Sequence, residues 1–187
     1  MMGLVGYVGL GFRHIADFAA MDHLLFLVAL VAPYRVRDWR HLLLVASAFT
    51  VGHSLTLALA VTDVVRLPTA LIEFLIPVTI ILAAAGNLLR RPGSPSGNRS
   101  ALLALGFGLI HGAGFANFLR SMFEGSVAGP LVAFNTGIEL GQVLIVMMVL
   151  AVFFLADRAL TLRIRAAVVS LAAACWALVV AAERAPW

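Results

Sequence analysis

Long apolar runs dominate this sequence and decide the environment in which the chain folds. Short segments containing Arg, Pro and Gly separate them. A helix of about 20 apolar residues crosses the hydrocarbon core of a lipid bilayer. Only 12% of the residues are charged, whereas soluble domains contain about 25%, so the chain lacks the polar surface that a water-soluble globule needs. The sequence therefore predicts a membrane protein and argues against a soluble enzyme.

Six of the apolar runs are near or above the length that spans a membrane. They are continuous, which favours helices, because the strands of membrane barrels alternate in polarity over about ten residues. We expect an all-α fold: a polytopic membrane protein with about six transmembrane helices and a single domain over residues 1–187. The predicted helices cover residues 4–32, 42–61, 69–89, 101–119, 131–156 and 164–182.

All thirteen basic residues are Arg, and their placement predicts the orientation of the chain. Because cytoplasmic connections are enriched in Arg, we expect the connections after the first, third and fifth helices to face the cytoplasm. Both termini then lie outside a bacterial inner membrane. The same placement explains the net charge of +4 without a nucleic-acid partner. Those connections hold Arg35, Arg37, Arg40, Arg90, Arg91, Arg99, Arg158, Arg163 and Arg165, against Arg13, Arg66, Arg120 and Arg184 elsewhere.

Polar side chains inside the predicted helices are the strongest functional signal. Ionisable groups at membrane depth are costly, usually face the bundle interior and by default mark a functional site. With the expected orientation, segments from different helices bring these groups to one level in the outer half of the bilayer. The residues are His14, Asp17, Asp22, His23, His53, Glu73, His111, Asn135, Glu139 and Gln142.

The donor groups of these side chains favour a divalent metal ion. Imidazole, carboxylate and carboxamide suit Ni, Co, Zn or Mn, and the single cysteine, Cys175, argues against a thiolate-held ion or cluster. A ligand imidazole normally has its second nitrogen held by a carboxylate or carbonyl, which Asp22, Glu73 or Glu139 would supply. Glu73 has a second interpretation, as an acidic residue that stabilises the start of its helix.

Glycines accompany the polar residues in two of the predicted helices. Gly137 and Gly141 form a G-x-x-x-G pattern that permits close helix approach. Four more glycines surround His111, and they indicate either helix packing or an accessible backbone. These four are Gly106, Gly108, Gly112 and Gly114.

The sequence resembles the second branch of the HupE/UreJ family, small bacterial membrane proteins linked to hydrogenase and urease accessory functions. The resemblance implies a membrane protein of six helices or similar, and the family is generally regarded as nickel or cobalt permeases. It runs from about Gly11 to Val149. The matching motifs are His14-Ile15 and those at residues 22–27, 48–57, 106–116 and 134–142, with Glu73 and Asn87 at matching places.

Two departures from the family pattern leave questions open. Members usually place five residues between the first His and the Asp-His pair, whereas seven separate His14 from Asp22. On a continuous helix His14 and His23 would point about 180° apart, so either the helix breaks near Asp17 or Asp17 replaces His14. The nickel-permease branch carries H-G-x-x-H-G-x-E. In this sequence Phe115 occupies the position of the second His of that motif and Phe118 the position of its Glu. The identity of the metal therefore cannot be taken from that branch.

The leading hypothesis is a divalent-metal permease of the inner membrane for nickel or cobalt, with the metal ion and lipid as partners and a homo-oligomer as one possible state. A metal-dependent intramembrane hydrolase is the alternative, with Glu139 or Asp22 as general base. A permease needs polar groups along an exit path to the cytoplasm, and the sequence offers few of them, which favours the hydrolase. A bis-histidine haem protein using His53 and His111 is a third class. The expected metal residues are Asp22, His23, His53, His111 and Glu139, with Asn135 and Glu73 supporting and His14 as the alternative to Asp17.

Overall fold

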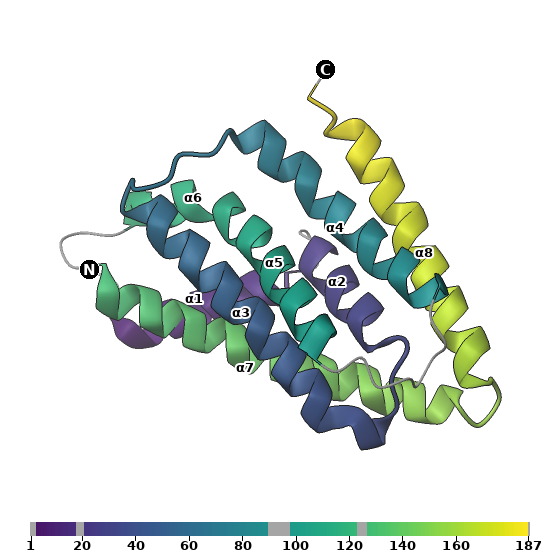
Figure 1. Ribbon diagram of the computed structural model, residues 1–187. Helices are drawn as coiled ribbons and strands as arrows, with labels where there is room; N and C mark the ends of the chain where they lie inside the picture. Colours follow the sequence, from purple (N-terminus) through teal and green to yellow (C-terminus); the bar gives the residue numbers. More distant parts are fainter. Residues whose placement is uncertain (1–2, 18–20, 90–97, 123–126, 187) are drawn as a thin grey trace.

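The computed structural model describes residues 3–17, 21–89, 98–122 and 127–186, and within these ranges the chain is helical with no strand (Figure 1). The all-α prediction is confirmed. Helices from distant parts of the sequence pack side by side: α3 lies along α5, α1 along α7, and α4 along α8. The elements are α1 Leu4–Ile15, α2 Met21–Val31, the 3-10 turn η1 Val36–Asp38, α3 Trp39–Val61, α4 Thr69–Leu89, α5 Asn98–Gly114, α6 Ala116–Met122, α7 Ala128–Ala156 and α8 Leu162–Glu183.

Four helices in the described residues are long and apolar enough to cross a membrane. They are Val36–Val61, which joins η1 to α3, and α4, α7 and α8. Six continuous spans are therefore not found. The predicted helix 4–32 is two helices, α1 and α2, and the predicted helix 101–119 divides into α5 and α6 at Phe115. Residues of low helix propensity stand at both breaks, with Asp17 at the first and Gly114 at the second.

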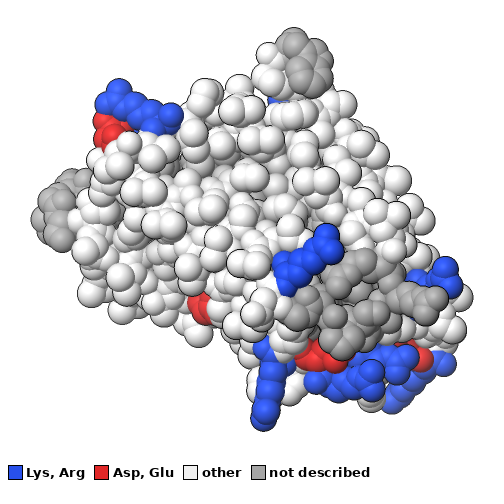
Figure 2. Space-filling model, in the orientation of Figure 1, with Lys and Arg blue, Asp and Glu red and all other residues white. Residues whose placement is uncertain are grey.

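On the face shown in Figure 2, most charged side chains gather at two ends of the molecule, and a broad band between them is nearly free of charge. At one end Asp63, which follows α3, pairs with Arg66 of the same connection and with Arg120 of α6. Such a band is what a lipid bilayer requires of the surface that it contacts. The chain is thus a membrane protein by composition, helix length and surface.

Glycines hold two pairs of helices in backbone contact. A methyl group at Gly52, Gly108 or Gly112 would overlap backbone atoms across the α3–α5 contact, and Gly112 faces the carbonyl of His53. The packing role of Gly108 and Gly112 is confirmed, whereas open space surrounds Gly106. This close approach places the helix turns that carry His53 and His111 against each other.

The G-x-x-x-G pattern of α7 makes the second close contact. Gly137 faces the backbone of Val8 on α1, and Gly141 faces the side chain of Ile15. Its predicted packing role is confirmed. The contact holds the end of α1, and therefore His14, against α7 in the centre of the protein.

Arg165 differs from what its place among the loop arginines suggested. It lies on α8 and is only 2% exposed. Its guanidinium binds the Asp157 carboxylate and donates to the carbonyls of Ala32 and Tyr34, which lie between α2 and η1. The Tyr34 hydroxyl in turn lies 3.3 Å from Ser100 at the start of α5. Three connections predicted to share one side of the membrane therefore meet at one end of the protein; Arg90 and Arg91 lie outside the described residues.

Candidate metal centre

Three imidazoles meet in the centre of the protein. His14 lies in the last turn of α1, His23 near the start of α2, and His53 within α3. One nitrogen from each ring lies within 4.8 Å of the other two. We call these three residues the histidine cluster. Its members come from segments up to 39 residues apart in the sequence, and the break between α1 and α2 brings two of them together.

The break decides between the two interpretations of the first helix. Because α1 ends at Ile15 and α2 begins at Met21, the rings of His14 and His23 are not held on opposite faces of one helix. Their centroids are 4.7 Å apart. Asp17 is exposed and stands outside the group of metal-ligand type. The structure therefore places His14, rather than Asp17, beside His23.

The ring nitrogens of the cluster are buried without hydrogen-bond partners among the described residues. This holds for both nitrogens of His53 and for Nε2 of His14 and of His23, whereas Nδ1 of His23 makes no hydrogen bond within the described ranges but lies beside the Asp22 carboxylate. His53 is 0% exposed and His23 5%. Burying a polar atom without a partner costs on the order of 1–3 kcal/mol, so a cluster of four such atoms is expected where a ligand binds.

Asp22 adds a carboxylate to one side of the cluster. Its Oδ1 lies 3.3 Å from Nδ1 of His23 and accepts a hydrogen bond from the His23 backbone N–H. Its Oδ2 lies 3.6 Å from the guanidinium of Arg184 at the end of α8. Asp22 also occupies the first turn of α2, where the helix dipole favours a negative charge.

His111, on the last turn of α5, lies next to the cluster with its ring centroid 5.1 Å from that of His23. Its Nε2 is 2.9 Å from the Thr79 hydroxyl, which donates to the carbonyl of Ile76 at 2.7 Å. Because that hydroxyl has used its hydrogen, Nε2 must be the donor to Thr79. The other nitrogen, Nδ1, then has a lone pair and no partner among the described residues.

Glu139 on α7 and Glu73 on α4 stand outside the group of possible metal ligands in the described residues. The Glu139 carboxylate accepts a hydrogen bond from Ser47, and the Gln142 carbonyl accepts one from Thr50 at 2.7 Å. Glu73 is exposed near the start of α4. The role of Glu139, Glu73 and Asn135 as metal ligands stays a prediction, although Oδ1 of Asn135 is buried and has no partner in the described ranges.

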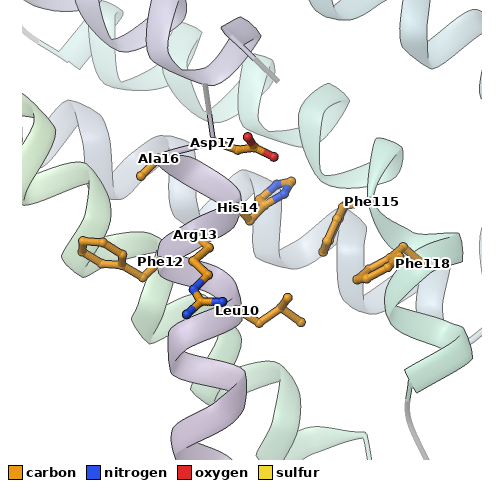
Figure 3. A pocket seen from close by; sticks show the side chains of 8 residues that line it. All are labelled: Leu10, Phe12, Arg13, His14, Ala16, Asp17, Phe115 and Phe118. Carbon is orange, nitrogen blue, oxygen red and sulfur yellow. The ribbon is translucent and has the colours of Figure 1, made fainter. Parts of the chain in front are cut away.

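A cavity of about 570 Å³ opens beside His14 (Figure 3). Figure 3 shows His14 pointing from α1 toward Phe115, with Arg13 on the same helix and Asp17 just after its end. The Phe115 ring is 4.0 Å from the ring of His14, centroid to centroid. The cavity therefore reaches the cluster from the side of α1 and α6. Its lining residues are Leu10, Phe12, Arg13, His14, Ala16, Asp17, Phe115 and Phe118.

Comparison with known proteins identifies the chain's relatives. A family model described as HupE / UreJ protein matches residues 1–184. The chain belongs to the HupE/UreJ family. This confirms the resemblance over nearly the whole chain and implies a membrane protein related to nickel or cobalt transport. No curated protein and no solved structure matches it.

In this HupE/UreJ protein, two phenylalanines that do not line the cavity pack against the cluster. The rings of Phe26 and Phe49 stack with centroids 4.8 Å apart, and both are 1% exposed. Phe49 also lies 5.1 Å from His111 and 6.1 Å from His53. Since Phe26 and Phe49 lie one helical turn from His23 and His53, toward the end that carries Arg165, they close the cluster in that direction.

Sequence reasoning missed two partners of the site in this HupE/UreJ protein. Arg184 was counted only as one arginine of the sparsely charged side, and Thr79 was not among the residues expected at the site. No sequence pattern predicts that Arg184 or Thr79 contacts the site, because each reaches it from a helix whose rotation is set by packing. The signal available was that both are polar residues in or next to apolar runs.

Proposed function

We propose that this HupE/UreJ protein is a permease for a divalent cation, nickel or cobalt, and that the histidine cluster binds the ion. One observation carries the proposal: three imidazoles from three segments bring one nitrogen each within 4.8 Å of one another, and four of their buried ring nitrogens have no partner among the described residues. Neutral imidazole is the commonest protein ligand for such metals. Asp22 contributes negative charge next to the bound cation, and His111 offers a further nitrogen.

The helix breaks support a cation at this position. His14 is on the last turn of α1 and His111 on the last turn of α5, so two helix C-termini end near the cluster. The C-terminus of a helix carries partial negative charge. Broken helices whose ends meet at an ion-binding site are typical of transporters. The arrangement therefore favours a positively charged substrate.

Transport requires the site to communicate with both sides of the membrane. We propose that α1 with α2, and α5 with α6, each cross the bilayer as a broken helix, so that six crossings place both termini outside the inner membrane of a bacterium. The cavity next to His14 then admits the ion from outside. Phe26 and Phe49 form the inner barrier, which has to move before release.

Polar groups of α3 and α7 lie between the histidine cluster and the inner end, beside that barrier and beyond it. Thr50 and Ser47 lie three and six residues inward of His53 on α3, and they contact Gln142 and Glu139. Ser47 was among the few polar groups expected on the inner side, and Thr50, Gln142 and Glu139 add to them. They weaken the observation that favoured a hydrolase.

The hydrolase alternative also lacks a placed general base. A base must lie within hydrogen-bond reach of the water that it activates. Glu139 binds Ser47 and stands outside the group of possible ligands, while Asp22 faces Arg184 as well as His23. For the haem alternative, the backbone contact between Gly112 and His53 leaves no slot for a porphyrin between α3 and α5.

The test is uptake by the purified chain reconstituted in liposomes, with Ni²⁺ and Co²⁺ measured separately. We expect wild-type vesicles to accumulate one or both ions, and His53→Ala and His23→Ala vesicles to accumulate neither. Liposomes with His41→Ala serve as the matched control, because His41 is remote from the cluster and contacts Tyr34. Equal uptake by wild type and His53→Ala would refute the proposal, and hydrolysis of a peptide or ester by the Zn²⁺-loaded protein, lost in His53→Ala, would replace it.

A further inference from the structure

One ion pair in the described residues reaches the edge of the histidine cluster from outside it. Arg184 caps the C-terminal end of α8, and its Nη1 lies 3.6 Å from Oδ2 of Asp22. The other carboxylate oxygen of Asp22 lies 3.3 Å from Nδ1 of His23. A single carboxylate thus stands between a guanidinium and a candidate metal ligand.

The two partners differ in their contact with water. The side chain of Asp22 is 11% exposed, whereas that of Arg184 is 37% exposed. A buried carboxylate needs a positive partner, because removal of a charge from water is costly unless the charge is paired. When the histidine cluster is empty, Arg184 is the cation that meets this need. Its partial exposure allows the guanidinium to turn into water if another cation takes its place.

A divalent ion bound by His23 would lie next to the same carboxylate. Two cations would then share one negative charge, and they repel each other more strongly near a buried site than in water. We infer that Arg184 is the counter-cation of the empty site, that the bound ion displaces it from Asp22, and that Arg184 lowers the affinity of the site for the ion. This inference rests on the proposed function.

Displacement also gives the site a mechanical consequence. Arg184 holds the end of α8 to the start of α2, and α8 packs along α4. When the ion binds, this tie between α8 and α2 is released. Binding at the cluster is thereby linked to the freedom of the last helix, and by linkage any force that draws Arg184 away favours ion binding.

The sign of the effect separates this role from a structural one. Loss of a structural arginine weakens a site, whereas loss of a competing cation strengthens it. We expect Arg184→Gln to bind Co²⁺ about tenfold more tightly than wild type, within the roughly 5- to 150-fold range typical of coupled sites. Arg184→Lys, which keeps the charge, should bind nearly as wild type does. Arg66→Gln removes one positive charge from the exposed pair with Asp63 and should leave affinity unchanged.

The experiment is titration of the full-length protein in detergent with Co²⁺, for these variants and for Asp22→Asn with and without Arg184→Gln. In the Asp22→Asn background the Arg184 substitution should lose its effect. Unchanged or weaker binding by Arg184→Gln, with a wild type that binds Co²⁺, overturns the inference and leaves the permease proposal standing. If wild type and Arg184→Gln bind neither Co²⁺ nor, in a parallel titration, Ni²⁺, the permease proposal is refuted and the inference falls with it.

A second measurement uses the wild-type protein and does not depend on a variant that folds. An arginine-specific dicarbonyl reagent modifies exposed guanidinium groups, and mass spectrometry locates the modified residues. We expect Co²⁺ to speed the modification of Arg184 and to leave that of Arg66 unchanged. Protection of Arg184 by Co²⁺, or an unchanged rate at saturating Co²⁺, would show that Arg184 stays on Asp22 and would overturn the inference.

Discussion

Two buried polar centres in the described part of the protein differ in whether their polar atoms have hydrogen-bond partners. At one end Arg165 is 2% exposed and its guanidinium binds Asp157 at 2.8 Å and the carbonyls of Tyr34 and Ala32 at 2.8 and 3.2 Å. The same group lies 4.2 Å from the centre of the Phe153 ring. In the middle of the protein His53 is 0% exposed, and neither ring nitrogen has a partner among the described residues.

The difference indicates what each centre is for. Folding has met the hydrogen-bonding capacity of Arg165 from three segments of the chain, so removal of Arg165 should cost stability. The nitrogens of His53 contribute nothing to the empty protein and are useful only when something binds them. Both residues are buried and polar, so burial alone does not distinguish a structural centre from a binding site. The distinguishing feature is whether the buried polar atoms have hydrogen-bond partners within the protein.

The largest effect is expected at the satisfied centre. Arg165→Met keeps most of the side-chain volume but leaves the Asp157 carboxylate and two carbonyls without their donor. Breaking a buried ion pair in this way costs about 3–5 kcal/mol. We expect thermal unfolding in detergent to show this loss equally with and without Co²⁺. Arg163→Met, at an exposed position on α8, should have little effect, and a stable Arg165→Met protein would contradict the assignment.

The unsatisfied centre should respond in the opposite way. His53→Leu replaces an imidazole that lacks partners with an apolar side chain of similar size, so the empty protein should be as stable as wild type or more stable. The ion-dependent stabilisation should disappear, which for wild type is about 2.7 kcal/mol at a Co²⁺ concentration 100 times Kd.

Thermal unfolding with and without Co²⁺ measures both quantities in the same samples. His41→Leu provides the control, since His41 lies beside Tyr34 at the end that carries Arg165 and should keep the full Co²⁺ response. If His53→Leu unfolds the empty protein as severely as Arg165→Met does, the two centres are not different in kind.

His111 combines both situations and gives an intermediate effect. One nitrogen is held by Thr79 and the other has no partner in the described ranges. Thr79→Val removes the group that fixes the tautomer of the ring, and loss of such a support typically lowers metal affinity about 10- to 100-fold. Thr79→Ser should restore it. We expect Co²⁺ titration to show this with little change in the stability of the empty protein.

A matched control is available on α7. The Thr136 hydroxyl also donates to a carbonyl of its own helix, that of Val132 at 2.9 Å, but it is exposed and does not contact a histidine. Thr136→Val should therefore bind Co²⁺ as wild type does. Equal affinities for Thr79→Val and Thr136→Val would show that the hydrogen bond to His111 does not support the site.

Four of the helices could be predicted from the sequence because their apolar runs have no interior break. Residues 69–89 coincide with α4, and α3, α7 and α8 begin or end within three residues of the predicted limits. The breaks in the other two predicted helices could not be predicted, because the length of an apolar run does not indicate where a helix ends. Asp17 marked one break as an alternative, whereas Phe115 gave no sign of the other.

The centre of the site was partly predictable for a related reason. His23 and His53 stand out because an ionisable residue in an apolar run is rare. The partners of the site depend on how far each helix is rotated. Glu139 was expected beside the histidines from its depth alone, and its hydrogen bond with Ser47 could not be predicted from that depth. The contact of Asp22 with Arg184 joins residues 162 positions apart, which no local pattern encodes.

The smallest effect is expected where charges meet in water. Asp63 pairs with Arg66 and with Arg120 at 3.1 Å, and its φ of 65° lies in the left-handed region that Asn also tolerates. Asp63→Asn therefore removes the charge without straining the turn. Because exposed pairs are screened by solvent, we expect a barely measurable change in the unfolding midpoint at neutral pH.

The pH dependence gives that last variant its signature. The hydrogen bond from Arg66 lowers the pKa of Asp63 from its ordinary value of 3.8. A carboxyl with a lowered pKa in the folded state stabilises the protein fully above its ordinary pKa, and this contribution is lost as the pH falls through the lowered value. Unfolding curves of wild type and Asp63→Asn should therefore converge in acid. If Asp63→Asn destabilised the protein as much as Arg165→Met, the strength of an ion pair in this protein would not depend on its burial or on the hydrogen bonds of its members. The contrast between the two polar centres would then be wrong.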